Sequence, residues 1–489
     1  MYLTMILLLF LNIKWYLCNL TDYLFRYLED KQTKMTKEKD NRDSLDYGEM
    51  RVPKLFRKLF WPTLFGMIAS VLLNLADGIF VGQGVGSDAL AAINVAAPVF
   101  LITTGVSLMF GSGVSIVAAV HMSKGNIKAA NINITQALTV GALVMAFILL
   151  CINMFPSVTC RLFGGSDKLY PLVRDYLLYV APCMFFMVIL MVGMFVIRLD
   201  GSPKYGMVCN ILGAVLNIIL DYVFVFPLHM GIKGAASATS ISSGVGALMI
   251  IFYLLFRSNH LKLYRPKFTR TALELTKRNC GYMIKLGFST FIAETAIGCM
   301  MIVGNFMFMS RLHEDGVAAF SVACYLTPLI FMFGNAISQS AMPIISYNYG
   351  RGNISRIHQT LRISVIFAVV CGLIMSLTGF FGAHMIADLF IKASSPAHAI
   401  CAAGLPLFSI CCLFYTINLV LIGYEQSLEN YKTATWFMIL RGYMLIIPCF
   451  ILLPLIMGNV GLWLAFPISE LITFLIFGMY MIYSNLRKA

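Results

Sequence analysis

The sequence predicts an all-α integral membrane protein with twelve transmembrane helices, arranged as two parallel repeats of six helices. Three observations predict this fold class. The 489 residues are 59% hydrophobic and only 12% charged, with a mean hydropathy of +0.82, whereas a soluble domain carries roughly a quarter of charged residues. Apolar runs of about 20 residues, long enough to cross a bilayer, recur along nearly the whole chain. The second half of the chain also repeats the first.

Twelve apolar runs stand between breaks that are charged or rich in glycine and proline. The first six are predicted at residues 60–82, 95–121, 133–156, 171–197, 204–226 and 233–256. The second six are predicted at residues 286–310, 318–347, 360–382, 398–421, 433–456 and 461–484. We therefore expect a first lobe over residues 51–257, a linker over 258–281 and a second lobe over 282–489.

Residues 1–50 show no pattern that would build a core. An early apolar run, LTMILLLFLNI, lacks the basic segment and the small-residue cleavage site of a signal peptide. The polar, charge-rich stretch after it is expected to be disordered. Two interpretations stay open for residues 1–34: a translated segment, or an overextended reading of the gene that truly starts at Met35.

Lysine and arginine gather on one side of the predicted membrane. They lie in the N-terminal segment, in the even-numbered loops and at the C-terminus, and eight of them occur between Arg257 and Lys285. Because these residues mark cytoplasmic loops, we expect both termini in the cytoplasm. The same loops explain much of the net charge of +14, so nucleic acid is not an expected partner.

The two halves align without a gap at an offset of 227 residues. The aligned segments include LAAINVA (90–96) with VAAFSVA (317–323), KGNIKAA (124–130) with RGNISRI (351–357), and MGIKG (230–234) with MGNVG (457–461). An even number of spans in each half gives both halves the same orientation in the membrane. Parallel repeats enclose a central cavity and work by rocking against each other, which indicates a transporter.

Three carboxylates stand inside predicted spans: Asp77, Asp221 and Glu294. A carboxylate there costs several kcal/mol and usually marks a pathway. At about 1.5 Å per residue, Asp77, Asp221 and Thr239 lie roughly 7–10 Å below the outer surface, and Asn217 shares a helix face with Asp221. Two carboxylates, an amide oxygen and a hydroxyl suit a proton or Na⁺, because hard cations prefer oxygen ligands. The alternative is two separate interhelical hydrogen bonds without an ion.

Glu294 lies near the middle of the seventh span. Three roles stay open for it: a second titratable site, a group that neutralises a cationic substrate, or a structural partner of a neighbouring helix. Glu470 in the twelfth span is a weaker case of the same kind. No cysteine or histidine cluster has the spacing of a metal site, so we expect neither a metal nor a cofactor.

Four segments resemble the multidrug and toxic compound extrusion (MATE) family. They are NLADGIFVGQGVGSDALAAINVAAP (74–98), LDGSPKYGMVCNILGAVLNIILDYVFVFPLHMGIKGAASATSIS (199–242), AISQSAMPIISYNYGRGN (336–353) and RGYMLIIPCFILLPLIMGNVGLWLAFPISELIT (441–473). The resemblance covers about residues 52–485 and favours the bacterial branch of MepA-like multidrug exporters, which implies a location in a bacterial inner membrane.

The resemblance implies two six-helix lobes in a V and a monomer that exports cationic or amphipathic organic compounds by alternating access. The coupling ion would be H⁺ or Na⁺. By motif, the cation site of the family falls on Asp77, Asn217, Asp221 and Thr239. Some members carry an acidic residue in the tenth span, but residues 398–421 contain none, so a cation site of that type is not expected in the second lobe.

Arg198 and Arg441 fall where the family often has basic residues at cytoplasmic helix ends, and we expect structural roles for them.

A lipid-linked oligosaccharide flippase would need several basic residues to hold pyrophosphate, yet only Arg174 and Arg441 approach the predicted spans. The second loop, MSKGNIKAAN, lacks the acidic-plus-arginine cluster of major facilitator carriers. The sequence contains neither a nucleophile–base pairing nor a phosphate-binding glycine loop, so we do not expect an enzyme.

Overall fold

The computed structural model describes residues 45–486 except 86, 164–168, 265–268 and 392–393, and within these ranges it contains helices and no strand. The first half contains α2 (Val52–Gly84), α3 (Ser87–Ser123), α4 (Ile127–Met154), α5 (Pro156–Leu162), α6 (Tyr170–Leu199), α7 (Pro203–Val225), α8 (Gly231–Phe252) and the π-helix η2 (Tyr253–Arg257). The second half contains α9 (Arg270–Gly350), α10 (Ile354–Phe381), α11 (Ala383–Phe390), α12 (Pro396–Ser409), α13 (Cys411–Ser427), α14 (Tyr431–Ile439), the π-helix η3 (Leu440–Leu445), α15 (Ile446–Met457) and α16 (Asn459–Leu486).

The helical stretches confirm the predicted membrane spans. Among the described residues, eleven stretches are long and apolar enough to cross a membrane. One of them, α9, contains two predicted spans, because its backbone leaves helical geometry at His313 (φ 53°, ψ −148°), where two helices meet at a kink. Dividing α9 at this residue gives the twelve spans that the sequence predicts.

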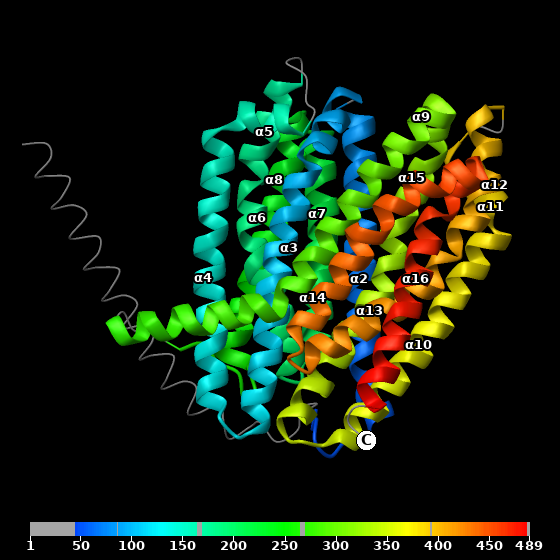
Figure 1. Cartoon of the computed structure of the whole chain (residues 1–489). Coiled ribbons are helices and arrows are strands. Elements are labelled where there is room, and N and C mark those ends of the chain that lie inside the picture. The colour runs from blue at the N-terminus through cyan, green and yellow to red at the C-terminus, as the bar shows by residue number, and fades with distance from the viewer. Residues whose placement is uncertain (1–44, 86, 164–168, 265–268, 392–393, 487–489) are drawn as a thin grey trace, which may run out of the picture.

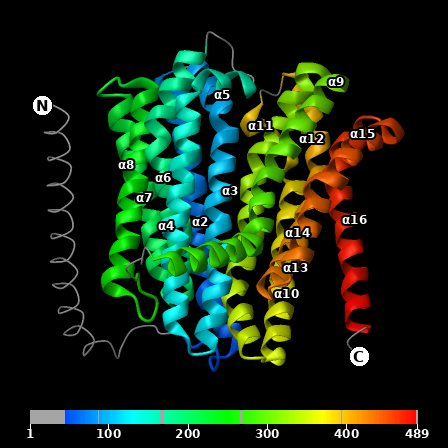
Figure 2. The same ribbon diagram turned by 60° about the vertical axis from the view of Figure 1, so that its left-hand side comes forward.

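The helices form two bundles that lie side by side (Figures 1 and 2). Each bundle has its own cluster of buried apolar side chains, one contributed mainly by α3, α4, α6 and α8 and the other by α9, α10, α12, α13 and α16. These two clusters are the cores of the first and second lobes, so the predicted architecture of two lobes is confirmed.

Helix α2 belongs to both cores. Leu55, Phe56 and Phe60, near its start, are buried in the core of the second lobe. The Phe60 ring packs edge-on against Phe367 of α10, with 5.4 Å between the ring centroids. Val81, near the end of α2, is buried in the core of the first lobe, where α2 packs along α7. Helix α2 therefore bridges the two lobes: its start packs in the second lobe and its end packs in the first.

The internal repeat is visible in how equivalent helices begin. Gly125 and Gly352 both have positive φ angles, 74° and 70°, and they lie 227 residues apart. The next residues, Asn126 and Asn353, cap α4 and α10, because each side-chain oxygen accepts a hydrogen bond of 3.3 Å from the backbone N–H three residues later. Glycine adopts a positive φ without steric cost, which explains why both halves keep a Gly-Asn pair at this turn.

The two lobes approach each other closely where α3 crosses the first span of α9. Two glycines make this crossing: a Cβ added to Gly113 would collide with the carbonyl of Met283, and one added to Gly287 with the carbonyl of Met109. Glycine permits such close contact between backbones. We call the end of the bundle where α2 begins the base, and the end where α2 finishes the top. This crossing lies on the base side of the molecule.

Side-chain hydrogen bonds reinforce the contact at the base. Ser112 of α3 and Thr290 of α9 lie 3.0 Å apart, oxygen to oxygen. The Gln426 amide on α13 donates to Thr290 Oγ1 at 3.1 Å and to the Leu286 carbonyl at 2.8 Å. The lobes are therefore sealed against each other on this side by backbone packing and by a buried polar cluster.

The residues before α2 are part of the folded base, which corrects one prediction. Tyr47 is buried, and its hydroxyl donates to the Arg198 carbonyl at 2.6 Å. Asn348 and Arg356 donate to the Tyr47 carbonyl at 3.0 and 2.9 Å. The expectation of disorder through residue 50 is wrong for residues 45–50, because one aromatic ring and its backbone hold a polar segment in place. Residues 1–44 of the same prediction lie outside the described residues.

The predicted linker 258–281 becomes helical at Arg270, where α9 begins. The first turns of α9 run across the bundle rather than along it (Figure 1). They are fixed to α4, where Gln136 Nε2 donates to Thr276 Oγ1 at 2.9 Å and Asn279 Nδ2 donates to Gln136 Oε1 at 3.0 Å. The connection between the lobes is thus packed against the first lobe before it enters the second.

Candidate functional site

The structure brings Asn217, Asp221 and Thr239 together between α7 and α8. Asn217 and Asp221 are fully buried and lie one helical turn apart on α7. The Asn217 amide lies 3.4 Å from the Thr239 hydroxyl. With its nitrogen facing Asp221, the amide donates to Asp221 Oδ2 at 3.0 Å, and its oxygen accepts from the backbone N–H of Thr239 at 3.1 Å. Asn217 therefore orients the Asp221 carboxylate.

Asp77 approaches this group from α2. It is close enough to Asp221 for the two carboxylates to interact electrostatically, and the buried Tyr176 of α6 is near both. One oxygen of each carboxylate, Oδ1 in both cases, is buried without a hydrogen-bond partner among the described residues. A buried polar atom without a partner is costly. These two acceptor atoms can therefore take up a proton or contact a cation.

A cavity of about 530 Å³ lies between the lobes, on the top side of the seal. Its volume falls in the range of roughly 300–1,000 Å³ that is typical of small-molecule sites. Its walls come from α2, α3, α6, α7 and both spans of α9, and they are rich in methionine and phenylalanine: Met67, Phe100, Met191, Met194, Phe195, Met207, Met301, Phe331 and Met332. Flexible methionine side chains allow one surface to fit ligands of different shapes.

Two charged side chains are among the described residues that line this cavity, Glu294 and Arg198. No hydrogen bond or ion pair among the described residues engages the Glu294 carboxylate. It also borders a smaller chamber of about 40 Å³ toward the base, together with Asn335 and Gln339. Glu294 is thus an anionic group presented to the cavity, which favours the predicted substrate and titratable roles over the structural one.

Arg198 is the functional candidate that the sequence predictions missed, because they assigned it a structural role at a helix end. It is 5% exposed, and its guanidinium donates to the Gln339 carbonyl at 3.3 Å and to Gln339 Oε1 at 3.2 Å. The guanidinium also lies 5.1 Å from the centroid of the Phe195 ring. The apolar residues around it in the sequence, Val196, Ile197 and Leu199, were the available signal that this arginine is buried.

The carboxylate closest to Arg198 in the sequence, Asp200, has other partners. It accepts hydrogen bonds from the Tyr253 hydroxyl at 2.7 Å and from the backbone N–H groups of Asn259, His260 and Leu261 at 2.6, 2.8 and 2.9 Å. Burial raises the pKa of Asp200, and these hydrogen bonds oppose the rise. Asp200 therefore anchors the segment after η2 and does not neutralise the arginine.

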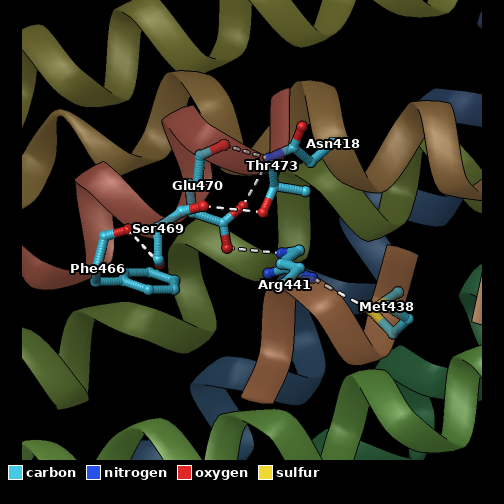
Figure 3. A network of polar contacts seen from close by, with 7 residues as sticks. All are labelled: Asn418, Met438, Arg441, Phe466, Ser469, Glu470 and Thr473. Atoms are coloured by element: carbon cyan, nitrogen blue, oxygen red, sulfur yellow. Dashed lines mark hydrogen bonds and ion pairs between the residues drawn. The ribbon is translucent and has the colours of Figure 1, made fainter. Parts of the chain in front are cut away.

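Glu470 differs from the other membrane carboxylates because it is paired. Arg441 Nε donates to Glu470 Oε1 at 2.6 Å, and Asn418 Nδ2 donates to Glu470 Oε2 at 2.8 Å (Figure 3). The Arg441 guanidinium also lies 4.2 Å from the centroid of the Tyr415 ring. All four residues are buried, and together they form a polar centre within the second lobe.

The position predicted for Arg441, near a cytoplasmic helix end, is wrong. The residue lies in the π-helix η3, which joins α14 to α15 within one continuous span, Tyr431–Met457. A single π-turn re-aims side chains within an otherwise regular helix. The expected structural role of Arg441 is consistent with its contacts, since they are all internal to the second lobe.

Comparisons with known proteins point to one family. The MatE family model matches the chain twice, over residues 62–223 and 290–451, as expected of an internal repeat. An FAD transporter from Shewanella oneidensis is 28% identical and covers 84% of this chain and 90% of its own. The multidrug export protein MepA of Staphylococcus haemolyticus is 24% identical, with coverages of 90% and 95%. The MepA protein of Staphylococcus aureus is 22% identical, with coverages of 84% and 89%.

Solved structures share the fold. An outward-facing multidrug resistance MATE family transporter of the MOP superfamily superimposes with a TM-score of 0.84 at 21% identity, covering 92% of this chain and 100% of its own. A MATE transporter of Vibrio cholerae superimposes with a TM-score of 0.82 at 21% identity, covering 90% and 98%. These similarities extend over both lobes of the chain.

Proposed function

This chain belongs to the MatE family of membrane transporters, and on that premise we propose that it exports cationic or amphipathic organic compounds in exchange for H⁺ or Na⁺. The observation that carries the proposal is the division of the unpaired carboxylates into two places. Glu294 lines an apolar cavity between the lobes, whereas Asp77 and Asp221 lie in the first lobe and are not among the residues that line this cavity. One place suits an organic cation and the other suits a small coupling ion.

The proposed coupling acts through helix movement rather than through competition at one site. On α2, Asp77 lies seven residues beyond Ser70, which lines the cavity. At 1.5 Å per residue, the two residues are about 10 Å apart along the helix axis. The same helix therefore contacts both ligands. Binding of the ion by Asp77, Asn217, Asp221 and Thr239 would change how α2 packs on α7, and hence the shape of the cavity wall.

Dye uptake into everted membrane vesicles, whose cytoplasmic face is outside, tests the proposal and separates the two ions. A proton gradient and a sodium gradient are imposed in turn, and the gradient that drives accumulation of a cationic dye identifies the coupling ion. We expect Glu294→Gln to weaken the apparent affinity for the cationic dye roughly tenfold, which corresponds to about 1.4 kcal/mol, and to spare an uncharged compound.

Glu274→Gln is the matched control, because Glu274 is an exposed glutamate on the same helix, outside the cavity. It should behave like the parent protein. If Glu294→Gln weakens the charged and the uncharged compound equally, the carboxylate shapes the cavity and does not recognise charge.

We propose further that the base faces the cytoplasm of a bacterial cell, since basic residues concentrate there. In intact cells, a cysteine introduced at Lys277, which is exposed in the segment predicted to be the cytoplasmic linker, should resist a membrane-impermeant thiol reagent. A cysteine at Val158, which is 60% exposed on α5 at the top, should react. The parent protein reports the background from native cysteines. The reverse labelling pattern would invert the orientation.

A flavin nucleotide is a second candidate substrate. The FAD transporter of Shewanella oneidensis is 28% identical to this chain, compared with 24% for MepA of Staphylococcus haemolyticus, and Arg198 places a cation at the cavity. Uptake of FAD into the same everted vesicles would favour it over drug export. A lipid-linked oligosaccharide is a weaker candidate, because Arg198 is the single cation among the described lining residues and pyrophosphate is typically held by several.

A further inference from the structure

Arg198 carries a buried charge that no carboxylate balances among the described residues. Its guanidinium has two hydrogen bonds among the described residues, both to oxygens of Gln339, and the nearby Tyr47 hydroxyl donates to the Arg198 backbone carbonyl rather than balancing the charge. The Asp200 carboxylate already accepts hydrogen bonds from the Tyr253 hydroxyl and from the backbone N–H of His260. A buried charge is costly unless an opposite charge compensates it. The protein thus keeps an unbalanced cation at the wall of its cavity.

The second charged group of the cavity does not neutralise Arg198 either. Glu294 and Arg198 line the same cavity, but no ion pair joins them within the part of the chain that the structure describes. Gln339, which accepts from Arg198, borders the cavity and also the small chamber next to Glu294. The amide of Asn210 lines the same cavity. One cationic and one anionic group are therefore both available to a ligand, in a cavity that is otherwise apolar.

We infer that Arg198 forms an anion subsite at the base side of the cavity, with Gln339 holding its guanidinium in place. This inference rests on the proposed export function and narrows its substrate class. The preferred substrates carry a carboxylate or phosphate for Arg198, an apolar or aromatic body for the methionine and phenylalanine walls, and a cationic or hydrogen-bond-donating group for Glu294. Arginine suits this task because its planar guanidinium binds carboxylate and phosphate with two parallel hydrogen bonds.

Two dyes that differ by one ester group test the subsite. Rhodamine 110 bears a free carboxylate, and rhodamine 123 is its methyl ester, so the aromatic body and the cationic charge are the same. Equilibrium binding to the purified full-length protein is measured by fluorescence anisotropy, and export is measured separately in vesicles. We expect Arg198→Gln to raise the Kd of rhodamine 110 at least tenfold and to leave that of rhodamine 123 within about twofold. Arg198→Lys, which keeps the charge but not the planar pair of donors, should restore only part of the affinity.

Arg174→Gln serves as the matched control, since Arg174 lies on the same helix and its side chain is 56% exposed. It should leave the affinities for both dyes unchanged. Displacement of rhodamine 110 by benzoate and by phenyl phosphate shows which anion the subsite prefers. If either competitor displaces the dye from the parent protein but not from Arg198→Gln, the subsite is supported.

An equal loss of affinity for both dyes in Arg198→Gln would overturn the inference, because it would show that Arg198 only ties α6 to α9 through Gln339. Equal affinities of the parent protein and Arg198→Gln for rhodamine 110 would overturn it as well. The export measurement tests the proposed function independently. If neither dye is exported but the binding of rhodamine 110 still depends on Arg198, the exporter proposal fails and the subsite stands.

Discussion

Replacing Asp77 or Asp221 with asparagine is expected to reduce gradient-driven export to the level of vesicles that contain no transporter. Each carboxylate has one buried oxygen without a partner, and the two interact with each other across the contact between α2 and α7. An amide of the same shape can neither accept the proton nor balance the charge of a cation. The fold should survive, because a neutral amide costs less in the membrane than a carboxylate.

The measurement is dye efflux from reconstituted vesicles under an imposed gradient, with equal protein amounts verified for each variant. Asp388→Asn is the matched control, because that carboxylate lies at the surface with its side chain 60% exposed. It should export like the parent protein. If both Asp77→Asn and Asp221→Asn also export like the parent, the coupling ion binds elsewhere in the molecule.

Breaking the Arg441–Glu470 pair is expected to have the largest effect on stability. Removing one partner of a buried ion pair typically costs about 3–5 kcal/mol, because the other charge stays buried without compensation. The two single variants should differ. Glu470→Gln leaves an arginine that cannot lose its proton, whereas Arg441→Gln leaves a carboxylate that can become neutral by taking up a proton. We therefore expect Glu470→Gln to be the more harmful change.

Thermal unfolding in detergent micelles measures both effects as shifts in Tm. The double variant Arg441→Met with Glu470→Leu should recover much of the loss, since apolar replacements of both partners are often neutral. The pair Arg270–Glu274, with side chains 96% and 71% exposed, provides the control, because surface ion pairs contribute roughly 0–1 kcal/mol. A Tm for Glu470→Gln that equals the parent value would mean that the pair contributes nothing to the fold.

The spans and the repeat could be predicted because lipid imposes a simple rule on sequence. Every helix that crosses the bilayer must be apolar over about 20 residues, so hydropathy locates each span without knowledge of its neighbours. The fixed rise of a helix also allowed depth to be calculated from residue number. Depth grouped Asp221 with Thr239 and Asp77, and helix periodicity added Asn217; the structure brings Asn217, Asp221 and Thr239 together.

Other parts of the site could not be predicted, because they depend on which helix faces meet. Arg198 and Glu294 line one cavity only because α6 of the first lobe lies opposite α9 of the second. Arg441 meets Glu470 through a π-turn that has no clear mark in the sequence. Residue number gives the height of a side chain in the membrane, but it does not give the direction in which that side chain points.

The two halves share their backbone arrangement, but their membrane carboxylates do not lie at equivalent positions. At the offset of 227 residues, Asp77 corresponds to Gly304 and Asp221 to Pro448. In the opposite direction, Glu470 corresponds to Ser243. Each lobe therefore carries its own set of membrane carboxylates: unpaired ones in the first, and an ion pair together with the cavity carboxylate in the second.

The position of α2 in both cores has a consequence for the order in which the protein is made. Leu55, Phe56 and Phe60 leave the ribosome early, yet the residues that bury them, such as Phe367 on α10, are translated about 300 residues later. Contacts between residues so distant in the chain form late. A first lobe synthesised alone would leave the Phe56 and Phe60 rings uncovered, so the start of α2 is buried only after α10 has been made.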